Sequence, residues 1–255
     1  NVRAQGAMIT VECDKRLIPL FSRSFPGITY VEMGDPHCFI MNRKTFDYHA
    51  IVCRLARHFR PGLPGFPSRP SYLRADMGKR TRLRQRYLAG RGGVKLVGIA
   101  WHSKKSINFG HKKSLRLLDF LPVLEREGVV FVDLQYGDTL GERLAFTAET
   151  GIPILHDDSI DQMVDLDSFA AQVAAMDVVV TISNTTAHMA GALGVPTLLI
   201  LEDVPSLWFW GITGERSPWY PAMRLFRAHK RGEWEEVLLR VAEALTAGLD
   251  AGAGS

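Results

Sequence analysis

The sequence predicts an α/β protein with two Rossmann-like domains and parallel sheets, the N-terminal domain being incomplete. Apolar, β-branched runs alternate with segments whose apolar residues recur at helical spacing over most of the 255 residues. The apolar runs have the length of strands buried on both faces, which is typical of parallel sheets. Pro and Gly clusters at 61–67 and 90–93 interrupt this alternation. We therefore expect domains at 1–92 and 93–246, followed by a flexible tail at 247–255.

The N-terminal region is expected to form strand, helix and strand in that order. MITVEC at 8–13 alternates like a strand, 17–25 has helical spacing and ends at Pro26, and ITYVEM at 28–33 is a second strand. A unit of this kind normally begins with a further strand and its loop, which we expect to be missing here. A helix at 49–59 and a basic linker helix that contains RTRLRQRY complete this domain.

The second domain is expected to hold four buried strands and a short fifth strand at 224–227. The four strands are VKLVGIAW, GVVFVDLQ, MDVVVTIS and PTLLILE. Helices are expected at SLRLLDFLPVLEREG, DTLGERLAFTAETG, DSFAAQVAAM, TTAHMAGALG and EWEEVLLRVAEAL. Repeated strand–helix units require right-handed crossovers and hence a doubly wound parallel sheet.

Composition excludes several classes of protein. With 46% hydrophobic and 23% charged residues, the chain is neither disordered nor fibrous. Its three cysteines form no C-x-x-C pair, which argues against a disulfide framework or a cysteine zinc site. No apolar run approaches the roughly 20 residues that span a bilayer, and no signal peptide pattern is present. We expect a cytoplasmic protein.

The positive charge is concentrated in one part of the chain. Seventeen Lys and Arg and a single acid lie between Arg54 and Arg116, although the net charge of the whole chain is only +4. Such a block fits a phosphorylated substrate, an anionic membrane surface to which the protein binds peripherally, or a solvated helix face. No nucleic-acid-binding signature accompanies the block, so we expect no nucleic acid partner.

Ligands bind doubly wound sheets at the carboxyl ends of the strands. The loop after MDVVVTIS is the most informative of these ends. Ser183 or Asn184 can cap the following helix, whose free amides form an anion site. Thr185 and Thr186 add hydroxyl groups, and His188 lies on the first turn. The alternative is a capped helix whose histidine is a satisfied, partly buried core residue.

Other enzyme classes lack their motifs. No G-x-G-x-x-G follows a strand, and the phosphate-binding P-loop, the H-E-x-x-H zinc motif and the G-x-S-x-G elbow are absent from the sequence. Dinucleotide oxidoreductases, P-loop nucleotidases and hydrolases are therefore disfavoured. The acids at 157–161 are interpreted as solvated loop residues, and no metal site is expected.

The sequence resembles the family 9 glycosyltransferases, the ADP-heptose:lipopolysaccharide heptosyltransferase superfamily, and within it the branch associated with tetratricopeptide repeats. The segments that carry the resemblance are KLVGIAWHS, FVDLQYGD, DLDSFAAQVAAMDVVVTISNTTAHMAGALGVPT, SPWYPAMRLFR and, more weakly, ITVECDKRLIPLFSRSFPGITYV with FDYH. It implies a GT-B fold with a nucleotide-sugar site in the C-terminal domain and an acceptor site in the N-terminal domain. It also implies sugar transfer with inversion and without a metal or other cofactor.

The resemblance assigns roles to individual residues. The family motif D-T-x-x-x-H places its histidine on His188 and its leading residues on Ser183 and Asn184, with serine instead of the usual aspartate. Family basic residues fall on Lys112 and Lys113, which would face the donor pyrophosphate. We add three further residues to the expected donor site, since they follow the first two strands of this domain: Ser103, Gln135 and Tyr136. Residues 163–166 are candidates for contact with the base.

The catalytic base stays unassigned at this stage. The family's general base lies in the loop expected to be missing, and Glu12, Asp14 and Asp47 match no motif. The acceptor is either lipopolysaccharide or a protein hydroxyl. Two non-enzyme alternatives remain: a degenerate relative that binds a nucleotide or partner without turnover, and a basic module that docks on an anionic surface. A nucleotide-sugar epimerase is disfavoured. The aromatic residues of 208–220 are expected to be mainly local core, with sugar stacking as the alternative.

Overall fold

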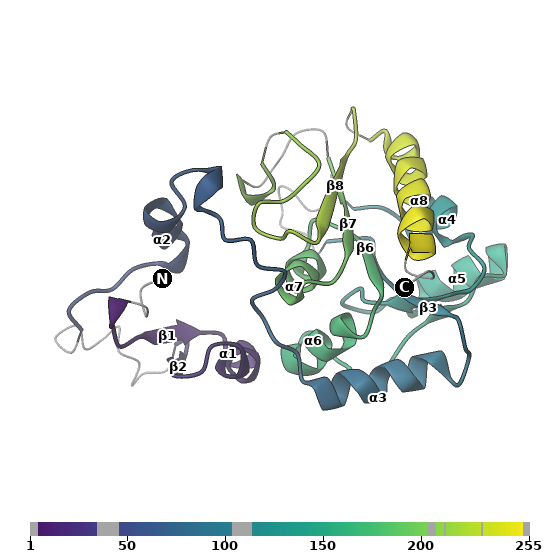
Figure 1. Cartoon of the computed structure of the whole chain (residues 1–255). Coiled ribbons are helices and arrows are strands. Elements are labelled where there is room, and N and C mark those ends of the chain that lie inside the picture. The colour runs from purple at the N-terminus through teal and green to yellow at the C-terminus, as the bar shows by residue number, and fades with distance from the viewer. Residues whose placement is uncertain are drawn as a thin grey trace.

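The computed structural model describes residues 5–34, 46–103, 114–202, 208–211, 213–230 and 232–251. It is an α/β structure with parallel sheets, as predicted, in which a small N-terminal lobe lies beside a larger domain (Figure 1). The described strands are β1 (Thr10–Cys13), β2 (Thr29–Glu32), β3 (Lys95–Ala100), β4 (Val129–Asp133), β5 (Ile154–Leu155), β6 (Val178–Ile182), β7 (Thr197–Leu201) and β8 (Met223–Arg227). The described α-helices are α1 (Ile18–Ser24), α2 (Val52–Phe59), α3 (Met77–Leu88), α4 (Leu121–Leu124), α5 (Leu140–Thr150), α6 (Leu166–Ala174), α7 (Thr185–Leu193) and α8 (Trp234–Ala251).

The small lobe contains the strand–helix–strand unit that the sequence predicts. β1 and β2 pair in parallel, with Thr10 opposite Thr29, and α1 connects them. α1 packs against α6 of the larger domain, where Leu20 is fully buried in the common core. The ion pair of Arg23 with Asp167, at the start of α6, adds to this contact. The lobe is thus fastened to the large domain by both apolar and charged side chains.

The large domain has one parallel sheet of six described strands in the order β5-β4-β3-β6-β7-β8. Successive side chains of each strand point to opposite faces, so both faces must be covered. One core lies under α3, α6 and α7 and includes Tyr87 and Phe169. The other lies under α4, α5 and α8 and includes Phe120 and Phe131. Figure 1 shows these two helix layers on either side of the sheet.

A glycine in the central strand brings β3 and the end of β4 close together. A Cβ atom on Gly98 would lie 2.2 Å from Cδ1 of Leu134 and 3.0 Å from Cγ of Met176. Real Cβ atoms do not approach carbon so closely, since the packed interior leaves no slack. The absent side chain therefore leaves the space that the side chains of Leu134 and Met176 occupy.

Three expectations about elements need correction. The helix expected at 114–128 is only a 3₁₀ turn at Leu117–Phe120 followed by α4, because the chain already turns toward β4 at Gly128, whose φ is +69°. The two-residue strand β5 was not expected, since it is too short to show a pattern. α8 continues to Ala251, so residues 247–251 of the expected tail are helical. Residues 252–255 lie outside the described residues.

The basic helix α3, expected in the linker, packs along α6 of the large domain. Asp76 caps its N-terminus by accepting from the amide of Lys79. Arg80 Nε and Arg84 Nη1 donate to the carbonyls of Ala174 and Ala175 at 2.8 and 2.7 Å. These carbonyls end α6, where the helix dipole favours positive charge.

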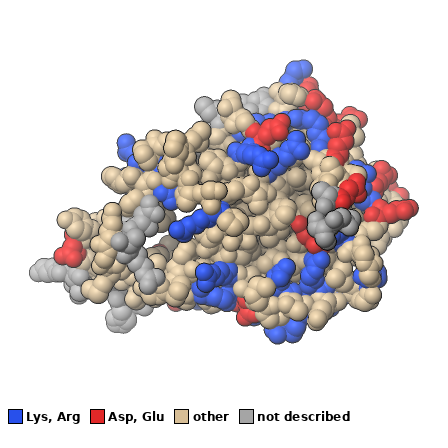
Figure 2. Space-filling model, viewed as in Figure 1, with Lys and Arg blue, Asp and Glu red and all other residues tan. Residues whose placement is uncertain are grey.

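The acids that neutralise α3 come from distant parts of the sequence. Arg84 pairs with Asp177 at 2.9 Å, and Arg86 pairs with Asp157. Lysine and arginine side chains line the lower edge of the molecule in the view of Figure 2, where α3 runs. Several cations of α3 are therefore engaged by carboxylates and carbonyls of the protein, while Arg82 and Arg86 stay exposed.

Candidate functional site

The carboxyl ends of three neighbouring strands define the candidate site. β3 lies between β4 and β6 in the sheet, and all three run in parallel. The connection after β3 leads to β4 on one side, whereas the connection after its neighbour β6 leads to β7 on the other side. Such a reversal between adjacent strands is the arrangement that forms a ligand crevice in open α/β sheets. The segments that begin at Trp101, Leu134 and Ser183 therefore meet at one edge.

The segment after β6 leads directly into α7. Asn184 is the N-cap, as the sequence allows, and its Oδ1 accepts from the amide of Ala187 and the hydroxyl of Thr181, both at 3.1 Å. Its Nδ2 is buried and has no hydrogen-bond partner. Thr185 is exposed on the first turn. A buried amide without a partner is costly unless another group satisfies it, so this helix start has unused donor capacity.

Thr186 and Ser183, both predicted donor-site residues, make hydrogen bonds within the protein at the start of α7. Thr186 Oγ1 donates to the carbonyl of Leu134 at 3.1 Å, which ties α7 to the end of β4. Ser183 is buried, and its Oγ accepts from Nε1 of Trp210 at 2.9 Å. The serine that replaces the family aspartate thus anchors the segment that follows β7. Trp210 and Tyr220 are buried in the core, which confirms the local-core interpretation for these two aromatic residues.

His188 is half-buried among aromatic rings. Its Nδ1 lies 2.9 Å from the hydroxyl of Tyr220. The ring of Trp210 stacks on the imidazole at a centroid distance of 4.7 Å and an angle of 17°, and Phe209 approaches edge-on at 4.7 Å. Sequence analysis did not pair His188 with Tyr220, because 32 residues separate them and no pattern links the two.

Gln135 joins the ends of β3 and β4. Its side chain is 1% exposed, and Oε1 accepts from the amides of Trp101 and His102 at 3.1 and 2.9 Å. Its Nε2 donates to the carbonyl of Tyr136 at 3.1 Å. This amide is therefore occupied by the protein itself, and it holds the two strand ends in register.

Ser103 and Tyr136 lie close to each other at this edge. Tyr136 is half-buried, its hydroxyl group hydrogen-bonds with Ser103, and its ring meets that of His102 at 5.9 Å. Burial raises the pKa of Tyr136 and lowers that of His102, so both are held in their neutral forms. Lys112 and Lys113 lie outside the described residues.

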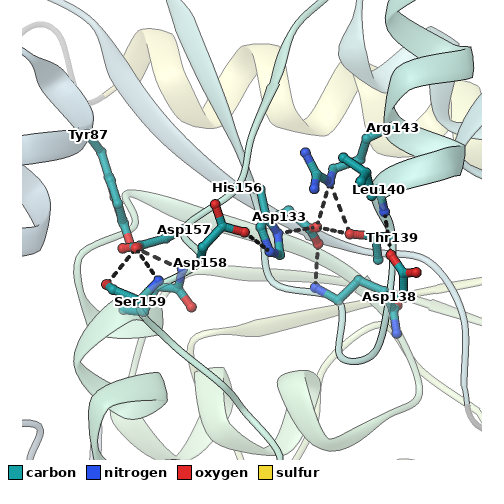
Figure 3. Close-up of polar contacts among 12 residues, drawn as sticks. Tyr87, Asp133, Asp138, Thr139, Leu140, Arg143, His156, Asp157, Asp158 and Ser159 are labelled. Atoms are coloured by element: carbon teal, nitrogen blue, oxygen red, sulfur yellow. Dashed lines mark hydrogen bonds and ion pairs between the residues drawn. The ribbon is translucent and has the colours of Figure 1, made fainter.

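A buried charged cluster at the end of β4 was missed by sequence analysis (Figure 3). The fully buried carboxylate of Asp133 accepts from Thr139 Oγ1 at 2.5 Å and lies 2.8 Å from His156 Nδ1 and 3.2 Å from Arg143 Nε. Its Oδ1 also accepts from the amide of Gln135 at 2.8 Å. The sequence does hold one signal for this cluster, because Asp133 ends an otherwise apolar strand. The cluster fixes the loop from which Gln135 and Tyr136 project.

A second carboxylate, Asp157, links this region to α3, as Figure 3 also shows. It accepts from the hydroxyl groups of Tyr87 and Ser159, at 2.5 and 2.6 Å. Burial by itself would raise the pKa of Asp157, but these hydrogen bonds hold it below its ordinary value. The acids at 157–161 are thus partly structural, rather than simply solvated.

Asp14, in the small lobe, is a poor candidate for the catalytic base. Asp14 accepts hydrogen bonds from the side chain and the amide of Arg16, which lower its pKa to about 2. A carboxylate so stabilised is a weak proton acceptor near neutral pH. Glu12 accepts from the amide of Gly34 at 3.4 Å, and Asp47 is exposed. None of the three is assigned as the catalytic base.

The described part of the chain lacks two further features. No helix there is long and apolar enough to cross a membrane. The same residues hold no group of three or more His, Cys, Asp or Glu placed to bind a metal ion. Residues 163–166, expected near a base, include Met163 and Val164, which are exposed, and the N-cap Asp165.

The sequence matches no protein-family model. It is 35% identical over 253 residues to Protein FlbA of Caulobacter vibrioides, an alignment covering 93% of this chain and 41% of FlbA. The chain thus spans less than half the length of this relative.

Two solved structures resemble the whole chain. E. coli ADP-heptose LPS heptosyltransferase II has a TM-score of 0.63 at 16% identity and covers 99% of this chain and 92% of its own. The family 9 glycosyl transferase from Veillonella parvula has a TM-score of 0.60 at 13% identity, with coverages of 95% and 88%. The chain therefore has the fold of family 9 glycosyltransferases, which confirms the predicted GT-B-like architecture.

Proposed function

We propose that the chain is a family 9 glycosyltransferase that moves a sugar from a nucleotide-sugar donor to a glycan or protein hydroxyl. The transfer would invert the anomeric centre and need no metal or other cofactor. The observation that carries this proposal is the meeting of the β3, β4 and β6 ends with the start of α7 at one edge of a glycosyltransferase-like fold. The 35% identity with FlbA is compatible with this proposal, but the name of that relative states no activity.

The start of α7 would bind the donor phosphates. When the sugar leaves its carrier, negative charge grows on the phosphate oxygens of the nucleoside diphosphate. The amides of the first turn, the positive end of the helix dipole and the exposed hydroxyl of Thr185 suit such a charge. The unpartnered Nδ2 of Asn184 adds a donor that the protein does not itself use. Donors fixed in advance need little reorganisation during the reaction, so they can replace a metal ion.

The nucleoside would lie over the ends of β3 and β4. Tyr136 and Ser103 present an aromatic ring and a hydroxyl group there, while Gln135 and Asp133 keep the strand ends in place behind them. Lys112 and Lys113, in the loop after β3, would contribute positive charge toward the pyrophosphate. The small lobe beside this edge would carry the acceptor, either a lipopolysaccharide or a protein hydroxyl.

Calorimetry with nucleotides tests the donor site directly. The chain is titrated with ADP, UDP, GDP and CMP at low and high salt, beside Thr185→Val, His188→Ala and the matched control His229→Ala. His229 is exposed between β8 and α8, where it pairs with Glu236. One nucleotide should bind selectively at both salt concentrations. Loss of one hydrogen bond to a charged group, about 1.5–3 kcal/mol, should weaken that binding about 10- to 100-fold in the first two variants only.

Three results would speak against the donor site. These are binding of no nucleotide, equal binding of all four, or equal affinity of His188→Ala and His229→Ala. Binding that disappears at high salt would instead indicate contact with surface charge.

Turnover separates an enzyme from a degenerate relative. The replacement of the family aspartate by Ser183, whose hydroxyl is engaged by Trp210, is the observation that favours the degenerate alternative. The nucleotide-sugar that corresponds to the selected nucleotide is incubated with the chain and candidate acceptors, and release of the nucleoside diphosphate is followed. Release that depends on an acceptor supports transfer. Binding without any release would support a nucleotide-binding module.

A further inference from the structure

The imidazole of His188 is held from several sides by described residues. Its Nδ1 meets the hydroxyl of Tyr220 at 2.9 Å, and the rings of Trp210 and Phe209 pack against it. Trp210 is itself held, because its Nε1 donates to Ser183 at 2.9 Å and its carbonyl accepts from Arg227 at 2.7 Å. The ring of His188 therefore has little freedom to rotate.

Tyr220 is fixed independently of its contact with His188. It is 8% exposed, and its amide donates to Ser217 Oγ at 3.3 Å within the turn of SPWYP. A Cβ on Gly191 would lie 2.4 Å from Cγ of Tyr220, so the glycine in α7 creates the space for its ring. Tyr72 of the segment joining the two lobes stacks on it at 6.1 Å and 23°, and the hydroxyl groups of the two tyrosines hydrogen-bond with each other. The hydroxyl is thus presented to His188 by a rigid support.

The contact between the two side chains selects between the tautomers of a neutral imidazole. A neutral imidazole carries its proton on one ring nitrogen, and the hydrogen bond made by the other nitrogen selects which. Burial raises the pKa of Tyr220, so its hydroxyl stays protonated at neutral pH and can donate. Donation to Nδ1 places the imidazole proton on Nε2, which then offers an N–H group. Such a donor suits a phosphate oxygen, whereas an unprotonated nitrogen would repel it.

We infer that Tyr220 is a positioning residue, which donates a hydrogen bond to Nδ1 of His188 and so fixes the orientation and the Nε2–H tautomer of the imidazole for binding a nucleoside diphosphate. The second half of this inference rests on the proposed function, whereas the first half concerns the protein alone. Tyr220 acts through His188 and is assigned no contact with a ligand. Because Tyr72 stacks on Tyr220, this support extends from the donor edge to the segment that joins the lobes.

Nuclear magnetic resonance of the ¹⁵N-histidine-labelled chain reads the tautomer without any ligand. Long-range ¹H–¹⁵N spectra distinguish Nε2–H from Nδ1–H and follow the pKa of each histidine. The variants are Tyr220→Phe, which removes only the hydroxyl, and the control Tyr30→Phe, whose hydroxyl donates to the carbonyl of Phe21 in the small lobe. His229, exposed in the segment between β8 and α8, is the internal reference. Urea unfolding of each variant verifies that it is folded.

We expect His188 to show mainly the Nε2–H tautomer in the unaltered chain and a mixture of both tautomers in Tyr220→Phe, with His229 unchanged. The affinity for the nucleoside diphosphate selected by calorimetry should fall about 3- to 10-fold in Tyr220→Phe, the loss expected for one neutral hydrogen bond. Tyr30→Phe should change neither quantity.

The spectra and the affinities overturn different statements. An Nδ1–H tautomer in the unaltered chain, or a spectrum of His188 that is the same in a folded Tyr220→Phe, overturns the assignment of Tyr220. A tautomer that shifts as expected while no nucleotide binds upholds the positioning role and overturns the proposed function. A tautomer that shifts without a change in nucleotide affinity overturns the role of this contact in binding.

Discussion

Gly191 offers the sharpest test of the packing that surrounds the candidate site. A methyl group at this position would lie 2.4, 2.7 and 2.8 Å from Cγ, Cδ1 and Cβ of Tyr220, all well inside van der Waals contact. These atoms belong to the root of a buried ring, which cannot move aside as the end of a flexible side chain can. Overpacking of this kind costs about 1–3 kcal/mol. The gain in helix propensity from alanine, about 1 kcal/mol, offsets part of this cost.

The matched control is Gly141→Ala in α5, where an added Cβ would meet nothing within 4 Å. Both substitutions gain helix propensity, so the difference between them isolates the clash. We expect the free energy of unfolding of Gly191→Ala to lie about 1–3 kcal/mol below that of Gly141→Ala. For a chain of this size each kcal/mol shifts the thermal midpoint by about 2–4 °C. Urea unfolding followed by circular dichroism measures the difference.

A double-mutant cycle with Tyr220→Ala identifies the cause of the loss. In that background the ring contacts at 2.4 and 2.7 Å are absent and only the contact with Cβ at 2.8 Å remains. Gly191→Ala should therefore destabilise the protein much less, and the coupling energy should be about 1–3 kcal/mol. The reasoning is refuted if Gly191→Ala costs the same, within about 0.5 kcal/mol, whether or not Tyr220 is present.

Three other predictions concern the charged contacts. Asp133→Asn should reduce the free energy of unfolding by about 3 kcal/mol, because it leaves Arg143 beside a neutral group in a buried cluster, and a loss under 1 kcal/mol by urea unfolding would contradict this. The folded pKa of Asp157 is lowered, so its contribution to stability is complete above the unfolded value near 4 and declines as the pH falls through the lower folded value. Unfolding midpoints between pH 2.5 and 6 should therefore fall less steeply for Asp157→Asn than for the unaltered chain, and equal slopes would exclude this role. Arg23→Met removes a partner of Asp167, so amide hydrogen exchange in α1 should accelerate at least several-fold while that of α7 stays constant, and uniform acceleration would indicate global destabilisation instead.

Local patterns in the sequence were sufficient to predict the parts of the site built from neighbours. The run VVVTIS predicts β6, and an asparagine after it predicts the cap of α7, because both signals lie within a few residues of the structure they form. Parallel pairing then follows from the alternation of strands and helices. From these premises, the start of α7 could be placed at the carboxyl edge of the sheet.

Contacts between distant segments could not be predicted from local patterns in the sequence. The acids that pair with α3 follow their partners by 71 to 93 residues, so a count of charges along the chain could only register an excess of cations. Gln135 was expected to face a ligand because it ends a strand, yet strand ends also need side chains that satisfy neighbouring amides, and it serves these amides. The partnership of His188 with Tyr220 depends on a glycine one helical turn away, which no spacing rule singles out.

Asp167 has a consequence for any relative motion of the two lobes. Its carboxylate forms ion pairs with two cations from different parts of the protein: Arg23 of the small lobe and Lys79 of α3, the helix packed along α6. If the small lobe swung away, Arg23 would leave with it and water would take its place, while Lys79 would remain. The carboxylate of Asp167 would therefore still be paired after opening. Removing the only partner of a buried charge costs roughly 3–5 kcal/mol, and most of this cost would be avoided. The electrostatic part of the contact between the lobes is therefore inexpensive to break and to re-form.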